Sequence, residues 1–420
     1  MRDWLDMLRP LYNWFLADRI DGYHQSLLQG EYCNLRTKSV RTPLTCSLNK
    51  SSMLHNPWKQ DGKRRGPGLM QDAYLPELKV ARPWYKAIHS NVLQMLIKRL
   101  DAAMEGFYKH GRGFPNFKNR SNFRSFQYKP NDVKIDGSKV YLPSVGWMRF
   151  HNSRPIPEGF NIRTVTIRFK TDGWYMSVRI EDKSVPEVLV PSDSDIKTVV
   201  GLDMGIGKLV YCSDGSAIDN PRFATSKKTR QKLKIRQRRV SRKKKGSRKQ
   251  RRCQQQVSQL QQQIASRRES YQRQIAFRIV SKADGIAVED LNIRGMKARC
   301  KPKYDEQKGR FLVNGQSAKR GLNRSISDAA WGELTRKIEY AAAKRGKKVY
   351  LVNPRHTSQE CSTCHHIDAD SRDGERFICT ACGHIDDANL RAARNVKAKA
   401  IKQYGLTIKH GTPGLGETVH

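Results

Sequence analysis

Two pairs of cysteines near the end of the chain constrain its fold more than any other feature. Cys361 and Cys364 form one Cys-x-x-Cys pair, and Cys379 and Cys382 form another. Such pairs lie at the tips of tight turns, and two facing turns place four sulfurs around one tetrahedral ion. Few apolar residues lie between the pairs, so metal binding must supply folding energy. The spacing predicts a ribbon around one structural Zn²⁺, with two disulfides or four unrelated cysteines as the alternatives.

The charge of the chain predicts the kind of partner. Its 420 residues include 80 Lys and Arg but only 39 Asp and Glu, which gives a net charge of +41. This excess is too large for an ordinary enzyme and indicates a polyanion, for which nucleic acid is the natural choice. The other cysteines lack the spacing of a disulfide framework, and we find neither a secretory signal nor a membrane-spanning run. We expect a cytoplasmic, nucleoid-associated protein with no membrane partner.

Changes in apolar spacing along the chain predict an α+β protein of several domains. Residues 1–112 carry apolar side chains at helical spacing, which predicts a helical domain. Residues 113–190 contain short alternating runs between turn signals, typical of a small antiparallel β-barrel. Residues 196–352 and 386–420 alternate strand and helix patterns, and they enclose the cysteine segment 353–385. We therefore expect the ribbon to be an insert in a larger sheet domain.

Three further interpretations concern aromatic residues, a basic segment and the start of a helix. Trp14, Trp84 and Tyr85 lie in helical patterns, which favours the core over stacking on nucleic-acid bases. Residues 294–324 are basic and irregular, and we interpret them as a mobile lid. Ser327 precedes a helical pattern, so it is the expected N-cap of that helix.

A long basic segment predicts the surface that binds nucleic acid. Residues 226–280 combine dense Lys and Arg with apolar residues at helical spacing. A solvated charge run is the usual explanation of such a segment, but this density favours a pair of helices that follow phosphates. The cations that we expect to contact nucleic acid are Lys227, Lys228, Arg230, Lys234, Arg238, Arg239, Arg242 and Lys243.

Acidic residues follow two apolar runs that predict buried strands. Asp203 ends one run and Glu289 ends another, while Asp387 precedes a helical pattern that starts near Asn389. Because strand ends gather at one edge of a sheet, three converging acids would bind two Mg²⁺ ions, which prefer oxygen ligands. Two metals would activate water against a phosphodiester. An N-cap is the alternative role for Asp387.

Together these motifs resemble the TnpB family of transposon-encoded RNA-guided nucleases, which are related to compact type V CRISPR effectors. The resemblance covers roughly residues 10–400 and implies a helical recognition domain, a β-barrel wedge domain and an RNase H-like (RuvC) nuclease with an inserted zinc ribbon. It also implies a guide RNA from the transposon end, a double-stranded DNA target and a short motif beside that target. The motifs are Gly201-Leu-Asp203-x-Gly205, Val288-Glu289-Asp-Leu291, Ser325-Ile-Ser-Asp-Ala-Ala-Trp331 and, after the ribbon, Ala392-Ala-Arg-Asn395.

The chain departs from the family pattern at the third acid. That pattern is Asp-x-Asn-Ala-Ala-x-Asn, and counting back from Ala392 places Asn389 where the acid belongs and Arg391 where the first Asn belongs. We predict that Asp387 completes the metal site with Asp203 and Glu289, with Asp386 as the next choice. The chain also begins inside the helix that follows the family's first strand, so we expect the barrel to lack one strand.

The displaced acid leaves three functions open. The first is a Mg²⁺-dependent, RNA-guided DNA endonuclease. The second is a nuclease-impaired protein that uses the same guide to bind DNA without cutting it. The third is a protein that binds transposon ends without a guide. The retained Asp203 and Glu289 favour the endonuclease, while Asn389 favours the second function.

Overall fold

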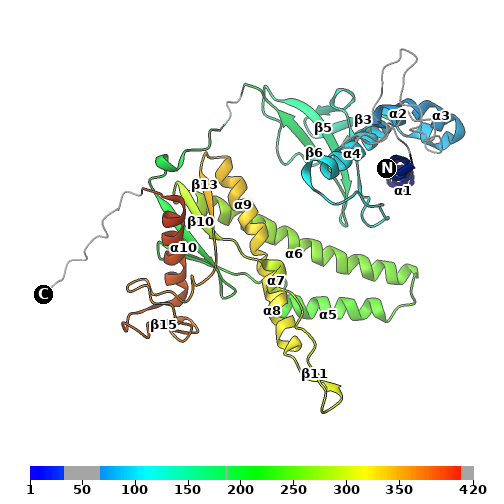
Figure 1. The fold of residues 1–420 in the computed structure, drawn as a ribbon. Helices are drawn as coiled ribbons and strands as arrows, with labels where there is room; N and C mark the ends of the chain where they lie inside the picture. Colours follow the sequence, from blue (N-terminus) through cyan, green and yellow to red (C-terminus); the bar gives the residue numbers. More distant parts are fainter. Residues whose placement is uncertain (33–66, 185–187, 408–420) are drawn as a thin grey trace. The chain divides into compact units, whose positions relative to one another are not determined.

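The computed structural model describes residues 1–32, 67–184 and 188–407. The chain forms two compact units, Met1–Val185 and Pro186–His420 (Figure 1). Part of the predicted helical domain, residues 33–66, and the tail from 408 onward lie outside the described residues.

The first unit begins with helices, as the apolar spacing predicts. Its helical part ends at Gly111, where the backbone has φ of 60°, a left-handed conformation that glycine adopts without steric cost. The helices are α1 (Arg2–Tyr32), α2 (Pro67–Ala73), α3 (Leu75–Ala81), the short 3₁₀ helix η2 (Pro83–Ala87) and α4 (Ser90–His110).

The strands of the first unit form two small antiparallel sheets, each with three strands. One sheet has the order β1-β5-β6, with β1 (Ser125–Tyr128), β5 (Asn161–Phe169) and β6 (Trp174–Glu181). The other contains β2 (Lys134–Asp136), β3 (Lys139–Leu142) and β4 (Gly146–Arg149). Because the described strands pair within two separate sheets, the closed barrel stays a prediction.

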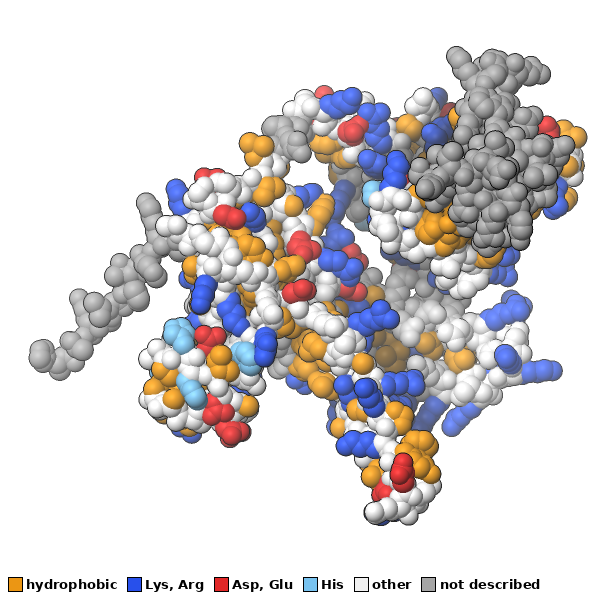
Figure 2. All heavy atoms as spheres, viewed as in Figure 1, with side chains coloured by type: hydrophobic (Ala, Val, Ile, Leu, Met, Phe, Trp, Pro, Cys, Tyr) orange, Lys and Arg blue, Asp and Glu red, His pale blue; other side chains and the backbone are white. Residues whose placement is uncertain are grey.

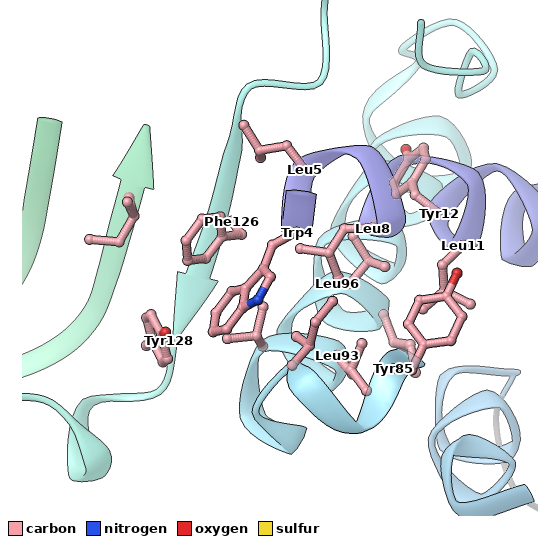
Figure 3. Close-up of a cluster of buried hydrophobic side chains, with 14 of the residues drawn as sticks. Trp4, Leu5, Leu8, Leu11, Tyr12, Tyr85, Leu93, Leu96, Phe126 and Tyr128 are labelled. Atoms are coloured by element: carbon pink, nitrogen blue, oxygen red, sulfur yellow. The ribbon is translucent and has the colours of Figure 1, made fainter. Parts of the chain in front are cut away.

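One apolar core joins the helices of this unit to its strands. Trp4 of α1 lies against Phe126 of β1, with ring centroids 5.5 Å apart, and Leu93 and Leu96 of α4 fill the space beneath (Figure 3). Tyr85 is buried in this core, as expected. The same expectation is wrong for two tryptophans, because Trp14 is 42% exposed and Trp84 is 52% exposed.

The second unit is built on a mixed sheet of five strands in the order β13-β10-β7-β8-β9. Strand β10 runs parallel to both β7 and β13, whereas β8 and β9 are antiparallel additions at the other edge. The strands are β7 (Val199–Met204), β8 (Lys208–Cys212), β9 (Ala217–Asp219), β10 (Gly285–Glu289) and β13 (Lys348–Val352).

Helices cover both faces of this sheet (Figure 1). Alternate residues of β7 and β10, such as Leu202 and Val288, pack against α6 (Arg248–Val280) and α9 (Trp331–Ala343). The opposite face, which includes Val199 and Ala287, packs against α10 (Ala388–Tyr404). Asp203 and Glu289 therefore belong to the face that α10 covers, because each lies an even number of residues from these positions.

The basic segment forms a helical hairpin of α5 (Lys227–Ser241) and α6, as its periodicity predicts. Ser226 caps α5 and Ser247 caps α6, each accepting a hydrogen bond from the backbone N–H three residues later. Both caps satisfy a backbone donor that the first helical turn leaves without an intrahelical partner.

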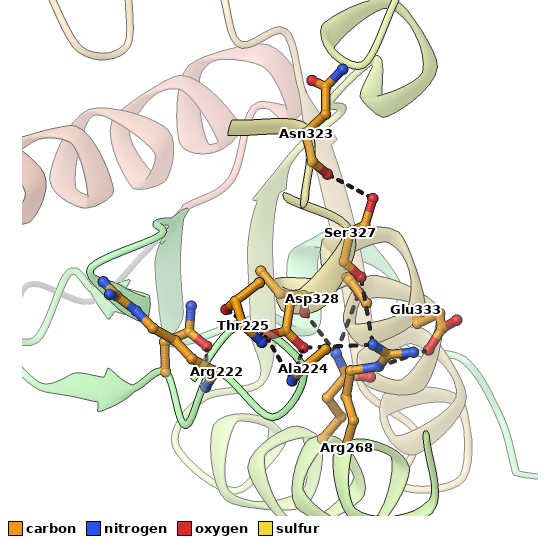
Figure 4. A network of polar contacts seen from close by, with 12 residues as sticks. Arg222, Ala224, Thr225, Arg268, Asn323, Ser327, Asp328 and Glu333 are labelled. Atoms are coloured by element: carbon orange, nitrogen blue, oxygen red, sulfur yellow. Dashed lines mark hydrogen bonds and ion pairs between the residues drawn. The ribbon is translucent and has the colours of Figure 1, made fainter. Parts of the chain in front are cut away.

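A buried carboxylate fixes the start of α5 (Figure 4). Asp328 accepts hydrogen bonds from the backbone N–H groups of Ala224 (2.9 Å) and Thr225 (2.8 Å), and from the Thr225 hydroxyl (2.7 Å). The guanidinium of Arg268, on α6, lies 3.8 Å from the same carboxylate. Asp328 thus ties together three segments that are distant in sequence, and its buried charge is fully compensated.

Two local predictions for this unit are wrong. Ser327 lies inside a helix, where its hydroxyl donates to the Asn323 carbonyl, because the chain turns later, at Ala330 with a left-handed φ of 52°. The segment 294–324 is also more regular than expected, while its role as a mobile lid stays a prediction. It contains the end of α7 (Ile293–Met296), the hairpin of β11 (Tyr304–Asp305) and β12 (Arg310–Phe311), and most of α8 (Gln316–Ala329).

Candidate metal centres and nucleic-acid surface

The four predicted zinc ligands come together in space. The Sγ atoms of Cys361, Cys364, Cys379 and Cys382 all lie within 4.8 Å of one another. The Sγ atoms of Cys361 and Cys382 are 3.8 Å apart, and those of Cys364 and Cys379 are 3.5 Å apart. Tetrahedral zinc with Zn–S bonds near 2.3 Å requires sulfurs roughly 3.8 Å apart. The donor set therefore fits one zinc ion, and the four thiols are free, which rules out the two-disulfide alternative.

The ribbon has little else to hold it together. Its strands are β14 (Arg372–Asp373), β15 (Arg376–Ile378) and β16 (Ile385–Asp387), and its buried cluster consists of Cys361, Phe377, Cys379 and Ala388. Hydrogen bonds from the backbone N–H groups of Cys382 and Ala381 lower the pKa of the Cys379 thiol to about 6, which favours the thiolate that binds metal. A core this small depends on its metal for stability.

The sheet places Asp203 and Glu289 side by side. Strands β7 and β10 are parallel neighbours, with Val288 level with Leu202, so the next residues along the two strands are Glu289 and Asp203. Burial and, second, the charge of Glu289 raise the pKa of Asp203 to about 7. Burial likewise raises the pKa of Glu289. Two partly buried carboxylates that repel each other are at their most stable with a cation between them.

A glycine lets α10 approach this pair closely. Gly201 lies two residues before Asp203, so both face α10. A Cβ atom at position 201 would lie 2.2 Å from the carbonyl oxygen of Ala393 and 2.6 Å from the backbone nitrogen of Lys397. Only glycine fits under the helix at this position. The close approach places the first turn of α10 near the two strand-end acids.

Asp387 stands at the start of α10 and acts as its N-cap. Its Oδ1 accepts hydrogen bonds from the backbone N–H groups of Asn389 (2.9 Å) and Leu390 (2.8 Å). Its charge also contributes to the raised pKa of Asp203, so it lies on the same side as the pair. Asp386, the second choice, is instead paired with Arg394 at 2.9 Å.

The three acids do not form a closed group. Among residues 1–32, 67–184 and 188–407, only the four cysteines bring three or more such ligand atoms within 4.8 Å of one another. The structure thus brings Asp203 and Glu289 together, while Asp387 as the third ligand stays a prediction.

An arginine of the ribbon, which the sequence did not single out, lies beside the acids. Arg372 donates from Nη2 to the Oδ1 of Asn389 at 2.8 Å. Its charge lowers the pKa of Asp203, against the larger effects of burial and Glu289. Asn389 therefore pairs with a cation at the position where the family pattern has an acid.

A second group of residues, to which the sequence assigned no role, positions Glu289. The Thr357 hydroxyl donates to its Oε1 at 2.6 Å, and Thr357 is only 2% exposed. Asn395 of α10 donates to the Thr357 carbonyl at 3.0 Å, and the fully buried Arg391 donates to the carbonyls of Ser358 (2.7 Å) and Glu360. Arg391 and Asn395 thus hold the segment that carries Thr357.

The predicted cations lie on α5 and in the turn after it. All of them are exposed to solvent, and Figure 2 shows blue side chains projecting from the hairpin. Their exposure fits a surface that meets phosphates, although their contact with nucleic acid stays a prediction.

The structure combines three features: an acidic pair on a mixed sheet, a four-thiol ribbon and a cationic hairpin. This combination places the chain in the class of proteins that act on nucleic acids. A family described as "Probable transposase" matches residues 175–299, and one described as "Cas12f1-like, TNB domain" matches residues 331–396. A protein of Escherichia coli strain K12, named "Putative RNA-guided DNA endonuclease InsQ", is 32% identical over 373 residues, 87% of this chain and 89% of that protein. The chain belongs to the TnpB family.

Two further similarities extend over most of the chain, one of sequence and one of fold. A Streptomyces pristinaespiralis protein named "Putative RNA-guided DNA endonuclease" is 28% identical over 345 residues, 81% of this chain and 79% of that protein. The fold resembles that of a solved structure described as "Cryo-EM structure of the Cas12f1-sgRNA-target DNA complex", with a TM-score of 0.50 and 12% identity, covering 94% of this chain and 81% of that one. No helix in the described part of the chain is both long and apolar enough to cross a membrane.

Proposed function

We propose that this protein is an RNA-guided DNA endonuclease. It would use a guide RNA made from the transposon end to recognise double-stranded DNA beside a short motif, and then hydrolyse the phosphodiester backbone. Two relatives that match most of the chain carry this activity in their names. The observation that carries the proposal is the pair of acids, Asp203 and Glu289, on adjacent strand ends.

The chemistry needs divalent metal, and the residues present suit it. Asp203 and Glu289, with Asp387, would hold two Mg²⁺ ions, since hard cations prefer carboxylate oxygens. Bound Mg²⁺ supplies an activated water and stabilises the leaving oxygen. Thr357 keeps the Glu289 carboxylate in one orientation, and a bound cation would favour the ionised form of Asp203, whose pKa is raised by burial and, second, by the charge of Glu289.

The remaining parts then take the roles typical of the family. Residues 1–112 would form the recognition domain and 113–190 the wedge domain. Residues 196–352 and 386–420 would form the RuvC-like nuclease, and the ribbon at 353–385 would bind target nucleic acid with its one Zn²⁺. These assignments are supported by the order of helices and strands along the chain.

One observation favours a second function, guided DNA binding without cutting. Asn389 stands where the family pattern has an acid, and its side-chain oxygen accepts a hydrogen bond from Arg372. One carboxylate oxygen of Asp387 already accepts the hydrogen bonds that cap α10. If neither residue supplies the third ligand, the protein would hold its target and leave it intact.

Cleavage by the purified ribonucleoprotein decides between these functions. The protein, with its co-purified RNA sequenced to define the guide, is given matching duplex DNA with and without Mg²⁺. We expect Mg²⁺-dependent cutting that Asp203→Ala abolishes and that Glu339→Ala, which removes an exposed acid of α9, leaves intact. Tight target binding without any nick would establish the second function. DNA binding with an affinity that does not depend on added RNA would contradict both functions.

A further inference from the structure

A cavity of about 310 Å³ lies between the first half of α5 and the middle of α6. Part of its lining is apolar: Phe223, just before α5, and Leu260 and Ile264 of α6. Its volume is at the lower end of the roughly 300–1,000 Å³ that small-molecule sites occupy. A cavity of this size admits one nucleotide and excludes a duplex.

Cations complete the lining. Lys228 and Lys232 of α5 and Arg267 of α6 line the cavity, and all three are exposed. None of their side chains forms an ion pair or hydrogen bond with another of the described residues, and no acid lines the cavity. Unpaired cations around an apolar floor favour a ligand that is flat and apolar on one side and anionic on the other.

The cavity is also held in shape before any ligand arrives. Phe223 makes an edge-on contact with Tyr271 of α6, with ring centroids 5.8 Å apart. The next two residues, Ala224 and Thr225, are fixed by the buried Asp328 (Figure 4). A ring fixed in this way loses little conformational entropy when a base stacks on it.

We propose that this cavity receives one unpaired nucleotide of a nucleic-acid strand, with its base on Phe223 and its phosphates between Lys228, Lys232 and Arg267. Gln263, which also lines the cavity, has an amide that can pair with the edge of the base. The inference rests on the proposed function, because a guide RNA or a displaced DNA strand would supply the nucleotide. The same chemistry serves both sources.

Binding of single strands to the full-length protein, freed of co-purified nucleic acid, tests this inference. The probes are oligouridine and oligothymidine of about 12 nucleotides, a length within the site sizes of single-strand binders, and a base-free deoxyribose phosphate strand of equal length. We expect the wild type to prefer strands with bases. Phe223→Leu, which keeps apolar volume but removes the ring, should weaken that preference about five-fold to a hundred-fold.

Two further variants separate stacking from folding. Phe223→Trp should restore the preference because it restores an aromatic face. Ile235→Ala removes an exposed apolar side chain from the same helix outside the cavity and should change nothing. If Phe223→Leu fails to fold, Lys232→Gln replaces it, and the slope of log affinity against log salt should fall by about 0.7.

The outcomes also distinguish this inference from the proposed function. A larger loss for oligouridine assigns the nucleotide to RNA, and a larger loss for oligothymidine assigns it to DNA. A second outcome is that the wild type binds both strands while Phe223→Leu, or Lys232→Gln in its place, binds them as Ile235→Ala does. In that case the cavity holds no nucleotide, and only this inference is wrong. If the wild type binds neither strand, this inference is wrong, while the proposed function is decided separately by the cleavage assay with the ribonucleoprotein.

Discussion

At the scale of single residues, Arg391 shows how the chain accommodates a departure from its family pattern. A fully buried arginine is costly unless its donors find acceptors. Arg391 meets most of this need with the carbonyls of Ser358 and Glu360 and with the ring of Phe377, over which its guanidinium lies, while its Nε has no hydrogen-bond partner among the described residues. Its charge therefore serves to attach the ribbon to α10.

The raised pKa of Asp203 predicts how stability depends on pH. The folded state holds this proton up to about pH 7, whereas an ordinary aspartate loses it near 3.8. Between these values the folded state binds more protons than the unfolded state, so stability falls as pH rises through that window. Asp203→Asn should remove this loss, so its melting temperature should exceed that of the wild type most clearly above pH 7, measured without added Mg²⁺. If the melting temperatures of the two proteins change with pH in the same way, the raised pKa of Asp203 is contradicted.

The two roles of Asp387 can be separated by one substitution. Asparagine is about as good an N-cap as aspartate, but it is a poor ligand for Mg²⁺. We expect Asp387→Asn to lower Mg²⁺-dependent cleavage by about a hundred-fold or more, since a metal carboxylate stabilises the transition state by several kcal/mol. The melting temperature should stay close to that of the wild type.

Asn389→Asp is the matched variant, because it restores the acid at the family position. If Asp387 is only a cap, Asp387→Asn should cut normally, and Asn389→Asp should raise cleavage instead. That pair of results would move the third ligand to position 389.

At the scale of elements, the contact between β7 and α10 sets the site. The sheet supplies two acids, and the helix supplies the third candidate and the residues that hold Thr357. Because Gly201 touches the helix backbone, any side chain there must push the two elements apart.

Gly201→Ala tests this packing. Its Cβ would lie 2.2 Å from a backbone oxygen, so we expect a loss of about 1–3 kcal/mol in unfolding free energy and loss of cleavage as α10 moves away. Gly321→Ala is the control in α8, where a Cβ meets nothing within 4 Å and should stabilise the helix by about 0.5–1 kcal/mol. Denaturant unfolding of both variants measures the difference, and equal stability would refute the close approach.

The ribbon is the second element that can be tested alone. Cys379→Ala removes one thiolate, so bound zinc measured by mass spectrometry should fall from one ion to none or nearly none. Because β16 leads directly into Asp387 and α10, cleavage should fall too, while hydrogen exchange in β7 and β10 should change little. The control is Cys253→Ala, on α6 and outside the ribbon, which should keep its zinc. Full zinc content in Cys379→Ala would overturn the four-thiol assignment.

At the scale of the whole molecule, net charge is the dominant property. A chain of +41 repels itself, and bound phosphates relieve this repulsion. Affinity for nucleic acid should therefore fall steeply with salt.

Neutralising part of α5 and the turn after it should reduce that dependence. The triple variant Lys234→Gln, Arg238→Gln and Arg242→Gln removes three of the cations that we expect to meet phosphates. The slope of log affinity against log salt should then fall by about 0.7–0.9 for each phosphate that the variant no longer neutralises. Titrations with duplex DNA at several salt concentrations measure the slope. An unchanged slope would place the nucleic acid on another surface.

Features whose chemistry is local could be predicted from the amino-acid sequence alone. The spacing of Cys361 to Cys382 predicts a four-thiol site, and the acids after apolar runs predict that Asp203 and Glu289 meet at a strand edge. The helix pair could be predicted because helical periodicity is visible over residues 226–280. Each of these rests on residues close in sequence, or on the rule that parallel strand ends share an edge.

Which distant residues support the acids depends on tertiary packing. Arg372, Thr357 and Arg391 reach the site through contacts between the ribbon, a loop and α10, and nothing in their local sequence predicts these contacts. Ser327 fits the local pattern of an N-cap, yet α8 continues through this residue and is capped at Ala330. The physical reason is common to all four: hydrogen bonds to buried groups are chosen by packing across the chain, while sequence patterns report only the preferences of neighbouring residues.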